Sequence, residues 1–473
     1  MEADFANRWQ SEHKESEKAV ELDRVLKHVD NTFEITRQNR NDRDDVLIQT
    51  SILASFTDHL GPIVGQSSKG TTESDDDARV IEVNLDYSSW YWVYSPDKAR
   101  KLQFAVHKGL LIRVGEHKQC VGVDLTDRNA AQWVSQASEA KRARVSTAKL
   151  GTQGDLECLG RLPNLESLET SGLSRDELEW ICQLGCPLRN LHLSWCPDLS
   201  SISPISQCPS LLRLHLSDCP ELREVSVIKD LENLRTLEIV NCDEIWEVDE
   251  IANAKKLRRI VFRNCENIYQ LNPLAVLPDL RLLDLSRSTH VADLAPLEKL
   301  NTLLSLDLSN CVRVRDVSPL EGLDSLQVLR LFGCNGLTNL RPLYQLENLK
   351  KLSLPNNIED SDLLGMCIGF SGLIQLDLRN CSTVTDISPM ARLKSLRELS
   401  LAGCREITDL SPLKELKRLT QLDLACCTKI SDLSPLHSLE RLKDLYIDGC
   451  YNIDDDDIRA FREAMPDCTV HQG

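Results

Sequence analysis

The chain has 473 residues and a formal net charge of −18, and this acidic balance argues against sequence-independent binding to nucleic acid. No segment approaches the roughly 18 consecutive apolar residues of a membrane span, and Met1–Gln10 is charged and lacks the apolar run of a signal peptide. The acidic start also argues against a mitochondrial transit peptide. With 18 cysteines and no secretion signal, we expect a cytoplasmic protein in a reducing compartment.

Residues 1–65 are predicted to form a helical N-terminal segment. One apolar stripe runs along a first helix through Leu22, Val25, Val29 and Phe33. A second apolar stretch, Val46–Val64, is stopped by Gly61 and Pro62. Residues 66–78 are rich in Ser, Gly, Thr and Asp, which predicts a flexible linker.

Residues 79–145 are predicted to form a small α+β unit that caps the C-terminal two-thirds of the chain. It contains four β-type runs, which are Val80–Leu85, Trp90–Tyr94, Leu102–Val114 and Cys120–Leu125. The run with Trp90, Tyr91, Trp92 and Tyr94 is either a docking patch or part of an N-terminal cap. We favour a cap for Trp90 and Trp92, which leaves Tyr91 exposed.

A repeat then dominates the chain and predicts a solenoid over residues 146–453. Its thirteen copies begin at Leu165, Leu188, Leu211, Leu234, Leu257, Leu280, Leu303, Leu326, Leu349, Leu373, Leu396, Leu419 and Leu442. Every step is 23 residues, except for the 24 residues from Leu349 to Leu373. A fixed period of this length indicates a repeat architecture in which each copy packs on its neighbours.

One copy, Leu419–Arg441, shows the expected path of the chain. Leu422 and Leu424 alternate with polar residues, which predicts a short strand with one buried face. Apolar residues then recur at every third position up to Leu439, and a Ser-Pro pair disfavours a long helix. The predicted fold class is therefore an α/β solenoid with a parallel concave sheet and a thin 3₁₀ or extended convex side.

The pattern of Leu399, Leu401, Cys404 and "ITDLSPL" (Ile407–Leu413) resembles the leucine-rich repeat family. Its short repeats resemble those of phosphatase-regulatory and internalin-like proteins, with cysteine in place of the family's asparagine. "LDLSNC" (Leu306–Cys311) also resembles the expression-site-associated leucine-rich repeat proteins of trypanosomes, which carry a cyclase-regulatory label. This resemblance implies a protein-binding solenoid, or a regulatory subunit of a phosphatase or adenylate cyclase.

Cysteine occupies the ninth position of most repeats. The column comprises Cys196, Cys219, Cys242, Cys265, Cys311, Cys334, Cys381, Cys404, Cys427 and Cys450, and Asn357 fills the same position in the repeat from Leu349. Such a column indicates either metal or redox chemistry, or a structural ladder of small buried side chains with a weak S–H donor. We favour the structural ladder.

Residues 454–473 are predicted to cap the C-terminal end. Asp454–Met465 has the pattern of a short helix with acidic residues at its start and Ile458 and Phe461 on one face. Cys468 and Val470 then supply a degenerate last strand. The acidic run lacks the glycine and the final glutamate of a calcium loop, so we assign it to capping.

The third, fifth and seventh positions of each repeat are expected to project from the concave sheet and to form the candidate binding surface. A central basic neighbourhood contains Arg259, Arg263, Arg287, Arg330 and the apolar Phe332, and an acidic C-terminal neighbourhood contains Asp423, Asp444, Tyr446 and Asp448. Opposite charges on one face suit a protein partner with its own charge pattern. The alternative is a solvated face without function, and an apolar Phe332 on an open sheet favours binding.

His192, His215 and Glu238 occupy one column of adjacent repeats and form a possible zinc site or pH switch. Because no fourth ligand is evident, we predict no metal there, and we predict no cofactor. No phosphate loop, nucleophile elbow or metalloprotease motif is present, so we expect no enzyme.

The sequence therefore predicts a non-catalytic scaffold for a protein partner. Two alternatives are the regulatory subunit named above and a structural subunit of a cytoskeletal or ribonucleoprotein assembly. A ubiquitin-ligase adaptor is disfavoured because no convincing F-box precedes the repeats. The oligomeric state stays open.

Overall fold

The computed structural model describes residues 80–85, 88–94, 103–107, 110–114, 119–125, 128–151 and 156–472. The helical segment 1–65 and the linker 66–78 of our sequence prediction lie outside these residues. The chain divides into two compact units, Met1–Trp195 and Cys196–Gly473. The proposed division into five sequence domains stays a prediction.

The first unit opens with an antiparallel meander of β1 (Val80–Leu85), β2 (Ser88–Tyr94), β3 (Gln103–His107), β4 (Leu110–Val114) and β5 (Gln119–Asp124). The four β-type runs of the sequence are confirmed as strands, and the run Leu102–Val114 forms two of them. The roles predicted for Trp90, Tyr91 and Trp92 concern side chains that lie outside the described set.

From β5 onward the strands of the first unit are parallel. They are β6 (Thr147–Leu150), β7 (Ser167–Ser171) and β8 (Asn190–Ser194), and the helices are α4 (Arg128–Gln136), α5 (Glu139–Arg142), α6 (Leu156–Leu159) and α7 (Arg175–Gln183). Helix α7 begins with a reciprocal capping box between Ser174 and Glu177. The change from antiparallel to parallel pairing marks the start of the repeat pattern.

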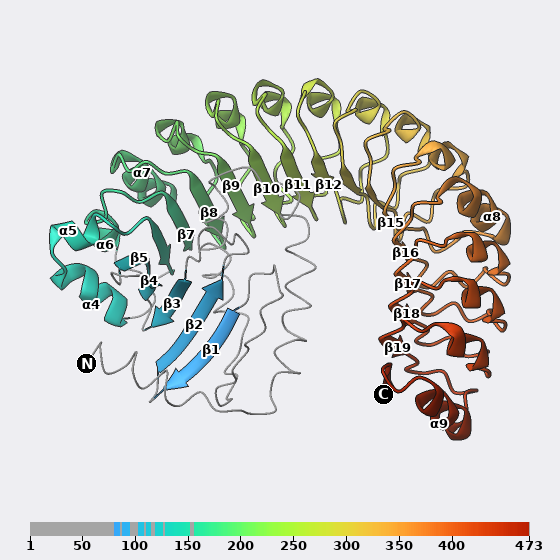
Figure 1. The fold of residues 1–473 in the computed structure, drawn as a ribbon. Coiled ribbons are helices and arrows are strands. Elements are labelled where there is room, and N and C mark those ends of the chain that lie inside the picture. The colour runs from blue at the N-terminus through green and yellow to red at the C-terminus, as the bar shows by residue number, and fades with distance from the viewer. Residues whose placement is uncertain are drawn as a thin grey trace. The chain divides into compact units, whose positions relative to one another are not determined.

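The second unit contains short parallel strands, one for each repeat. These are β9 (Arg213–Ser217), β10 (Thr236–Val240), β11 (Arg259–Arg263), β12 (Leu282–Asp284), β13 (Ser305–Asp307), β14 (Val328–Arg330), β15 (Lys351–Ser353), β16 (Gln375–Asp377), β17 (Glu398–Ser400), β18 (Gln421–Asp423), β19 (Asp444–Tyr446) and β20 (Thr469–His471). Within this unit the strands lie on the inner side of an arc and the connecting turns on the outer side (Figure 1).

The return segments of the second unit are mostly 3₁₀ helices. They are η1 (Ser203–Gln207), η2 (Ser226–Asp230), η3 (Asp249–Asn253), η4 (Asn272–Val276), η5 (Ala295–Leu297), η6 (Ser318–Leu320), η7 (Arg341–Gln345), η8 (Ser388–Arg392), η9 (Ser411–Glu415) and η10 (Ser434–Ser438). Proline stands at the start of η1 and of η4 to η10, where its fixed φ fits and its missing N–H is not needed. The predicted thin convex side is confirmed.

The 24-residue repeat departs from this rule, because its return segment is an α-helix, α8 (Asp360–Gly369). Glu359 and Asp362 form a reciprocal capping box at its start. A Cβ at Gly369 would lie 2.5 Å from the carbonyl oxygen of Tyr344, so only glycine lets the helix approach η7 this closely. Leu364 and Ile368 of this helix are exposed.

The predicted C-terminal cap is present. Helix α9 (Asp455–Ala464) begins at Asp454, whose carboxylate accepts a hydrogen bond from the Asp457 N–H, and Ile458 and Phe461 are buried. β20 then pairs with β19 in parallel and closes the described part of the sheet. Among the described residues, no helix combines the length and the apolar composition needed to cross a lipid bilayer.

The close approach of α8 to Tyr344 makes Gly369→Ala a test of the exceptional repeat. We expect the substitution to lower the free energy of unfolding by about 1–3 kcal/mol, since the added methyl group meets a backbone carbonyl that cannot move aside. Urea denaturation followed by circular dichroism measures this change. Gly322→Ala is the matched control, because no neighbouring atom lies within 4 Å of a Cβ there. Equal stability of the two variants would show that α8 does not require this glycine.

Candidate functional site

The fifth position of each repeat forms one continuous column across the inner sheet of the second unit. The strand register aligns His215, Glu238, Val261, Asp284, Asp307, Arg330, Ser353, Asp377, Ser400, Asp423, Tyr446 and His471. The alignment predicted from the 23-residue period is therefore confirmed over these repeats. Neighbouring members lie about 4.8 Å apart, so their side chains interact directly.

The aspartates of this column also fix the ends of their own strands. The Asp284 carboxylate accepts a hydrogen bond of 2.9 Å from the Ser286 N–H, and Asp307 accepts an equivalent bond of 2.9 Å from the Ser309 N–H. Asp423 does the same for the N–H of Ala425 at 3.0 Å. A short carboxylate that bonds the backbone two residues ahead is typical of turns. These acids therefore have a structural task before any partner binds.

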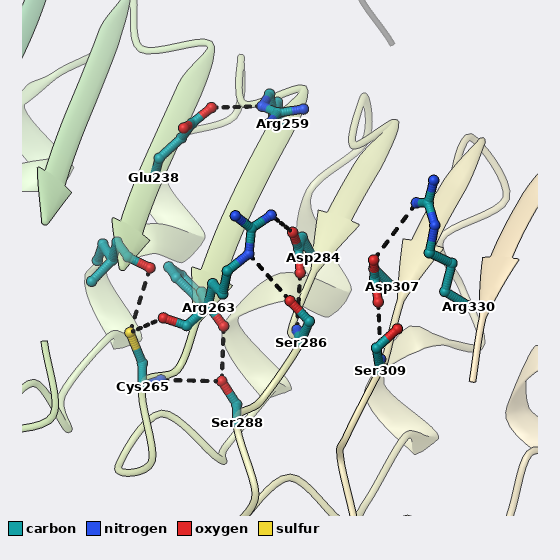
Figure 2. A network of polar contacts seen from close by, with 12 residues as sticks. Glu238, Arg259, Arg263, Cys265, Asp284, Ser286, Ser288, Asp307, Ser309 and Arg330 are labelled. Carbon is teal, nitrogen blue, oxygen red and sulfur yellow. Dashed lines mark hydrogen bonds and ion pairs between the residues drawn. The ribbon is translucent and has the colours of Figure 1, made fainter. Parts of the chain in front are cut away.

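Three of the predicted arginines pair with carboxylates on neighbouring strands (Figure 2). Arg259 Nε lies 2.7 Å from Glu238 Oε1, and Arg330 Nη1 lies 3.6 Å from Asp307 Oδ2. Arg263 donates to Asp284 through Nη2 and to Ser286 Oγ through Nε. The predicted basic neighbourhood is therefore a row of ion pairs with an almost balanced charge.

Burial and neighbouring charges shift the pKa values of this row in different directions. Burial alone would raise the pKa of Glu238, but the hydrogen bond from His215 and the charge of Arg259 outweigh it and hold the pKa well below its usual range. Burial raises the pKa of Asp307, and the neighbouring Asp284 carboxylate adds to this shift. Burial would lower the pKa of Arg263, but Asp284 raises it further above its ordinary value.

Phe332 is half-buried and lies beneath a cation. The guanidinium carbon of Arg379 is 5.6 Å from the centre of the Phe332 ring, within the range of a cation–π interaction. The Arg379 side chain also donates three hydrogen bonds to Asp377 at the end of β16, from Nε to Oδ1 at 3.0 Å and to Oδ2 at 3.1 Å, and from Nη2 to Oδ2 at 2.7 Å.

Our sequence prediction did not include Arg379. The signal was available, because Phe332, Pro355 and Arg379 occupy the seventh position of three successive repeats. A long arginine reaches across the short proline ring to the phenylalanine.

Arg287 differs from the other predicted arginines. It is exposed, has no ion pair among the described residues, and adopts φ +64° at the eighth position, where most other repeats carry Asn or Gly. Two earlier members of this column, Asn241 and Asn264, are joined by a hydrogen bond of 3.0 Å. Arg287 therefore presents an unpaired guanidinium beside the ion-pair row.

The predicted acidic neighbourhood is organised by a residue that sequence reasoning missed. His471 of β20 stacks on Tyr446, with ring centres 4.2 Å apart and planes 9° from parallel, and its Nε2 lies 3.2 Å from Asp444 Oδ1. Asp448 is half-buried. The column register predicts this contact once the degenerate last strand is counted as a further repeat.

The histidine column does not show the geometry of a metal site. His215 Nδ1 lies 3.0 Å from Glu238 Oε2, and the other oxygen of Glu238 bonds Arg259. His192 belongs to the first unit. Within the described part of the chain, no group of three or more His, Cys, Asp and Glu side chains could hold a metal ion. Glu238 therefore joins His215 and Arg259, with one carboxylate oxygen directed to each.

The cysteine column joins successive repeats. Sγ of Cys404 donates to the carbonyl oxygen of Leu378 at 3.1 Å, and Sγ of Cys427 donates to that of Leu401 at 3.0 Å. Where Ser288 replaces cysteine, its Oγ donates to the Phe262 carbonyl at 2.8 Å. Burial raises the pKa of the Cys404 thiol to about 12, so it stays a protonated donor. The column thus has the structural role that we favoured.

Comparisons with known proteins agree with this architecture. A family model described as "Leucine Rich repeats (2 copies)" matches residues 371–415. A leucine-rich repeat protein of Leptospira interrogans is similar in structure, with a TM-score of 0.51 and 21% identity over 72% of this chain and 98% of that chain. The chain matches none of the curated protein sequences.

Two further solved structures are similar to this chain at lower TM-scores. An internalin from Listeria monocytogenes has 21% identity over 74% of this chain and 91% of that chain, with a TM-score of 0.43. A chain of the Rad7 and Elc1 complex in yeast has 21% identity over 62% of this chain and 83% of that chain, with a TM-score of 0.43.

The repeats, their cysteine ladder and the parallel inner sheet define a leucine-rich repeat solenoid. The chain has the leucine-rich repeat fold, a fold that commonly mediates protein–protein interaction.

The bridge at Glu238 predicts a specific dependence of stability on pH. Because the folded-state pKa of Glu238 is lowered, its contribution is present above the unfolded pKa of about 4.3 and is lost as the pH falls below that value. Glu238→Gln should therefore be less stable than the wild type at pH 7, and the difference should shrink towards pH 3. Urea unfolding at several pH values measures it. The control is Glu321→Gln, at an exposed glutamate without an ion pair among the described residues, and an equal trend in both variants would contradict the assignment.

The thiol ladder predicts that serine replaces Cys404 better than alanine does. Cys404→Ala removes the donor to Leu378 and leaves a small void, which should lower the free energy of unfolding by about 1–3 kcal/mol. Cys404→Ser should cost less, since Ser288 already makes the equivalent bond. Urea midpoints of the two variants give the comparison. Equal losses would show that the thiol acts only by filling space.

Proposed function

We propose that the chain is a non-catalytic scaffold that holds a protein partner on the inner sheet of its second unit, between β11 and β16. The observation that carries this proposal is the half-buried Phe332, covered by Arg379 and flanked by paired arginines. An aromatic ring with an adjacent arginine is the typical centre of a protein interface.

The ion-pair row supports this proposal because its side chains are held in fixed positions. Arg263 is held by Asp284 and Ser286, and Arg330 is held by Asp307, so both side chains are positioned before a partner arrives. Positioned side chains lose less conformational entropy on binding. Arg287, which is exposed and has no ion pair among the described residues, offers a free cation to an acidic group of the partner.

The acidic C-terminal neighbourhood adds negative charge to the proposed face. Asp423, Asp444, Tyr446 and Asp448 lie on or beside β18 and β19, towards one end of the same sheet. We propose that they contact a basic segment of the same partner, so that charge sets its orientation.

We place the scaffold in a reducing compartment such as the cytoplasm. Its thiols act as hydrogen-bond donors between repeats, and oxidation would remove those donors. This argument concerns the compartment only and does not identify the partner.

The inner face is tested by Phe332→Ala combined with Arg379→Ala. Quantitative affinity purification from cell extract, followed by a binding titration with the main captured protein, should show a Kd at least about tenfold weaker than that of the wild type. Leu364→Ala combined with Ile368→Ala is the matched control, because it removes exposed apolar side chains from α8 on the outer side. Unchanged binding by the inner-face variant, with binding lost in the control, would move the interface to the outer side.

The same purification separates the two alternative functions. A catalytic phosphatase or cyclase subunit at equal stoichiometry would favour the regulatory subunit implied by the family resemblance. A particle of many subunits would favour the structural role.

A further inference from the structure

A basic depression in the last repeats of the second unit is lined by residues other than those named for the proposed binding face. Its volume is about 660 Å³, and its lining is Arg397, Lys417, Arg418, Ser438, Glu440 and Arg441. Four cations therefore surround one carboxylate, on a chain whose net charge is −18. A positive depression on an acidic chain is a local exception to the overall charge.

The repeat register forces these cations together. Arg418 and Arg441 are the last residues of two successive repeats, directly before Leu419 and Leu442, so they occupy equivalent positions. Parallel strands about 4.8 Å apart bring such equivalent positions side by side. Adjacent like charges repel each other, and Glu440 is the one carboxylate among the lining residues.

These arginines differ from those of the inner face in their partners. Among the described residues, the side chains of Arg397, Arg418 and Arg441 make no ion pair or hydrogen bond, and all three are exposed. The Lys417 ammonium group already has a partner within the chain, because its Nζ donates a hydrogen bond to the Ser438 carbonyl oxygen at 3.0 Å. The next lysine along this edge, Lys394, is paired with Glu415 at 2.6 Å. The three arginines thus keep their donors available.

We propose that this depression binds a phosphate monoester carried by a phosphorylated protein segment. Each guanidinium presents a planar fork of donors that matches phosphate oxygens, and three forks around one depression suit a doubly charged group. The site uses residues other than those of the inner face, so it extends the proposed function without depending on it.

The surroundings favour a phosphoprotein over other sources of phosphate. The cations precede three successive strands, β17, β18 and β19, which span about 10 Å at the strand spacing and therefore fit one or two phosphate groups rather than a polymer track. Among the described residues, no large exposed apolar side chain lies between Leu393 and Lys443 to enter a lipid surface.

The experiment uses a fluorescent peptide library with a fixed central phosphoserine, randomised flanks and an unphosphorylated twin. Fluorescence anisotropy with the full chain should give a Kd for the phosphorylated pool at least about tenfold tighter than for its twin, since the twin lacks the charged hydrogen bonds between the arginines and the phosphate. Inorganic phosphate should compete with the bound peptide.

Variants locate the site. Arg397→Gln, Arg418→Gln and Arg441→Gln together should weaken binding of the phosphorylated pool at least about tenfold. Lysine at the same three positions keeps the positive charge but lacks the paired N–H donors of a guanidinium group, and it should also weaken binding. The matched control is Arg313→Gln, Arg405→Gln and Arg462→Gln, which removes three exposed arginines outside the depression and should bind as the wild type does. Circular dichroism confirms folding, and the lysine variant serves as the test if the glutamine variant does not fold.

Other outcomes would overturn the proposal. These are equal affinity for the two peptide pools, unchanged binding in both arginine variants, or binding confined to RNA or to vesicles that contain phosphoinositides. Loss of phosphopeptide binding with an intact inner-face interaction would leave the proposed scaffold function untouched. Loss of the inner-face interaction alone would leave this site untouched.

Discussion

The structure of the second unit depends on one constraint, which is that no repeat can bury its own apolar face. A single repeat has a strand of three to five residues and a short return segment, and its leucines reach a dry interior only when another repeat packs on each side. The strand hydrogen bonds and the thiol donors of the ninth position both run from one repeat to the next. Stacking in sequence register is therefore the condition for folding.

The same register decides which surface residues meet. A side chain at a given position always lies beside the residue one repeat away, so the inner face consists of columns rather than of local patches. This explains why Glu238 reaches both His215 and Arg259, and why Tyr446 stacks on His471. It also explains the basic depression, where Arg418 and Arg441 share a column.

Periodicity alone predicted most of the fold. The spacing of leucines located the strands, the Ser-Pro pairs predicted the 3₁₀ turns, and the acidic run at Asp454 predicted the cap of α9. These features depend on local sequence and on the period, and both can be read from one chain. The α-helix of the 24-residue repeat was not predicted, because it depends on glycine packing against Tyr344 in the preceding repeat.

The candidate site was harder to predict, because its chemistry depends on the direction of each side chain. The arginines of the inner face were identified correctly as members of the sheet surface, but the sequence does not show that Arg263 turns towards Asp284 and Arg330 towards Asp307. Long side chains have many rotamers, and the choice among them follows from neighbours in other repeats. Arg379 was missed for the same reason, since its ring partner lies two repeats away.

The paired state of these arginines has a consequence for how the inner face responds to salt. A partner that covers Arg263 and Arg330 buries neutral pairs instead of bare ions, so fewer counterions leave the surface on binding. Contacts made through Phe332 are indifferent to ionic strength. The contribution of Arg263 and Arg330 to affinity should therefore change little with added electrolyte, and the salt dependence of binding should come from Arg287 and from the acidic C-terminal neighbourhood.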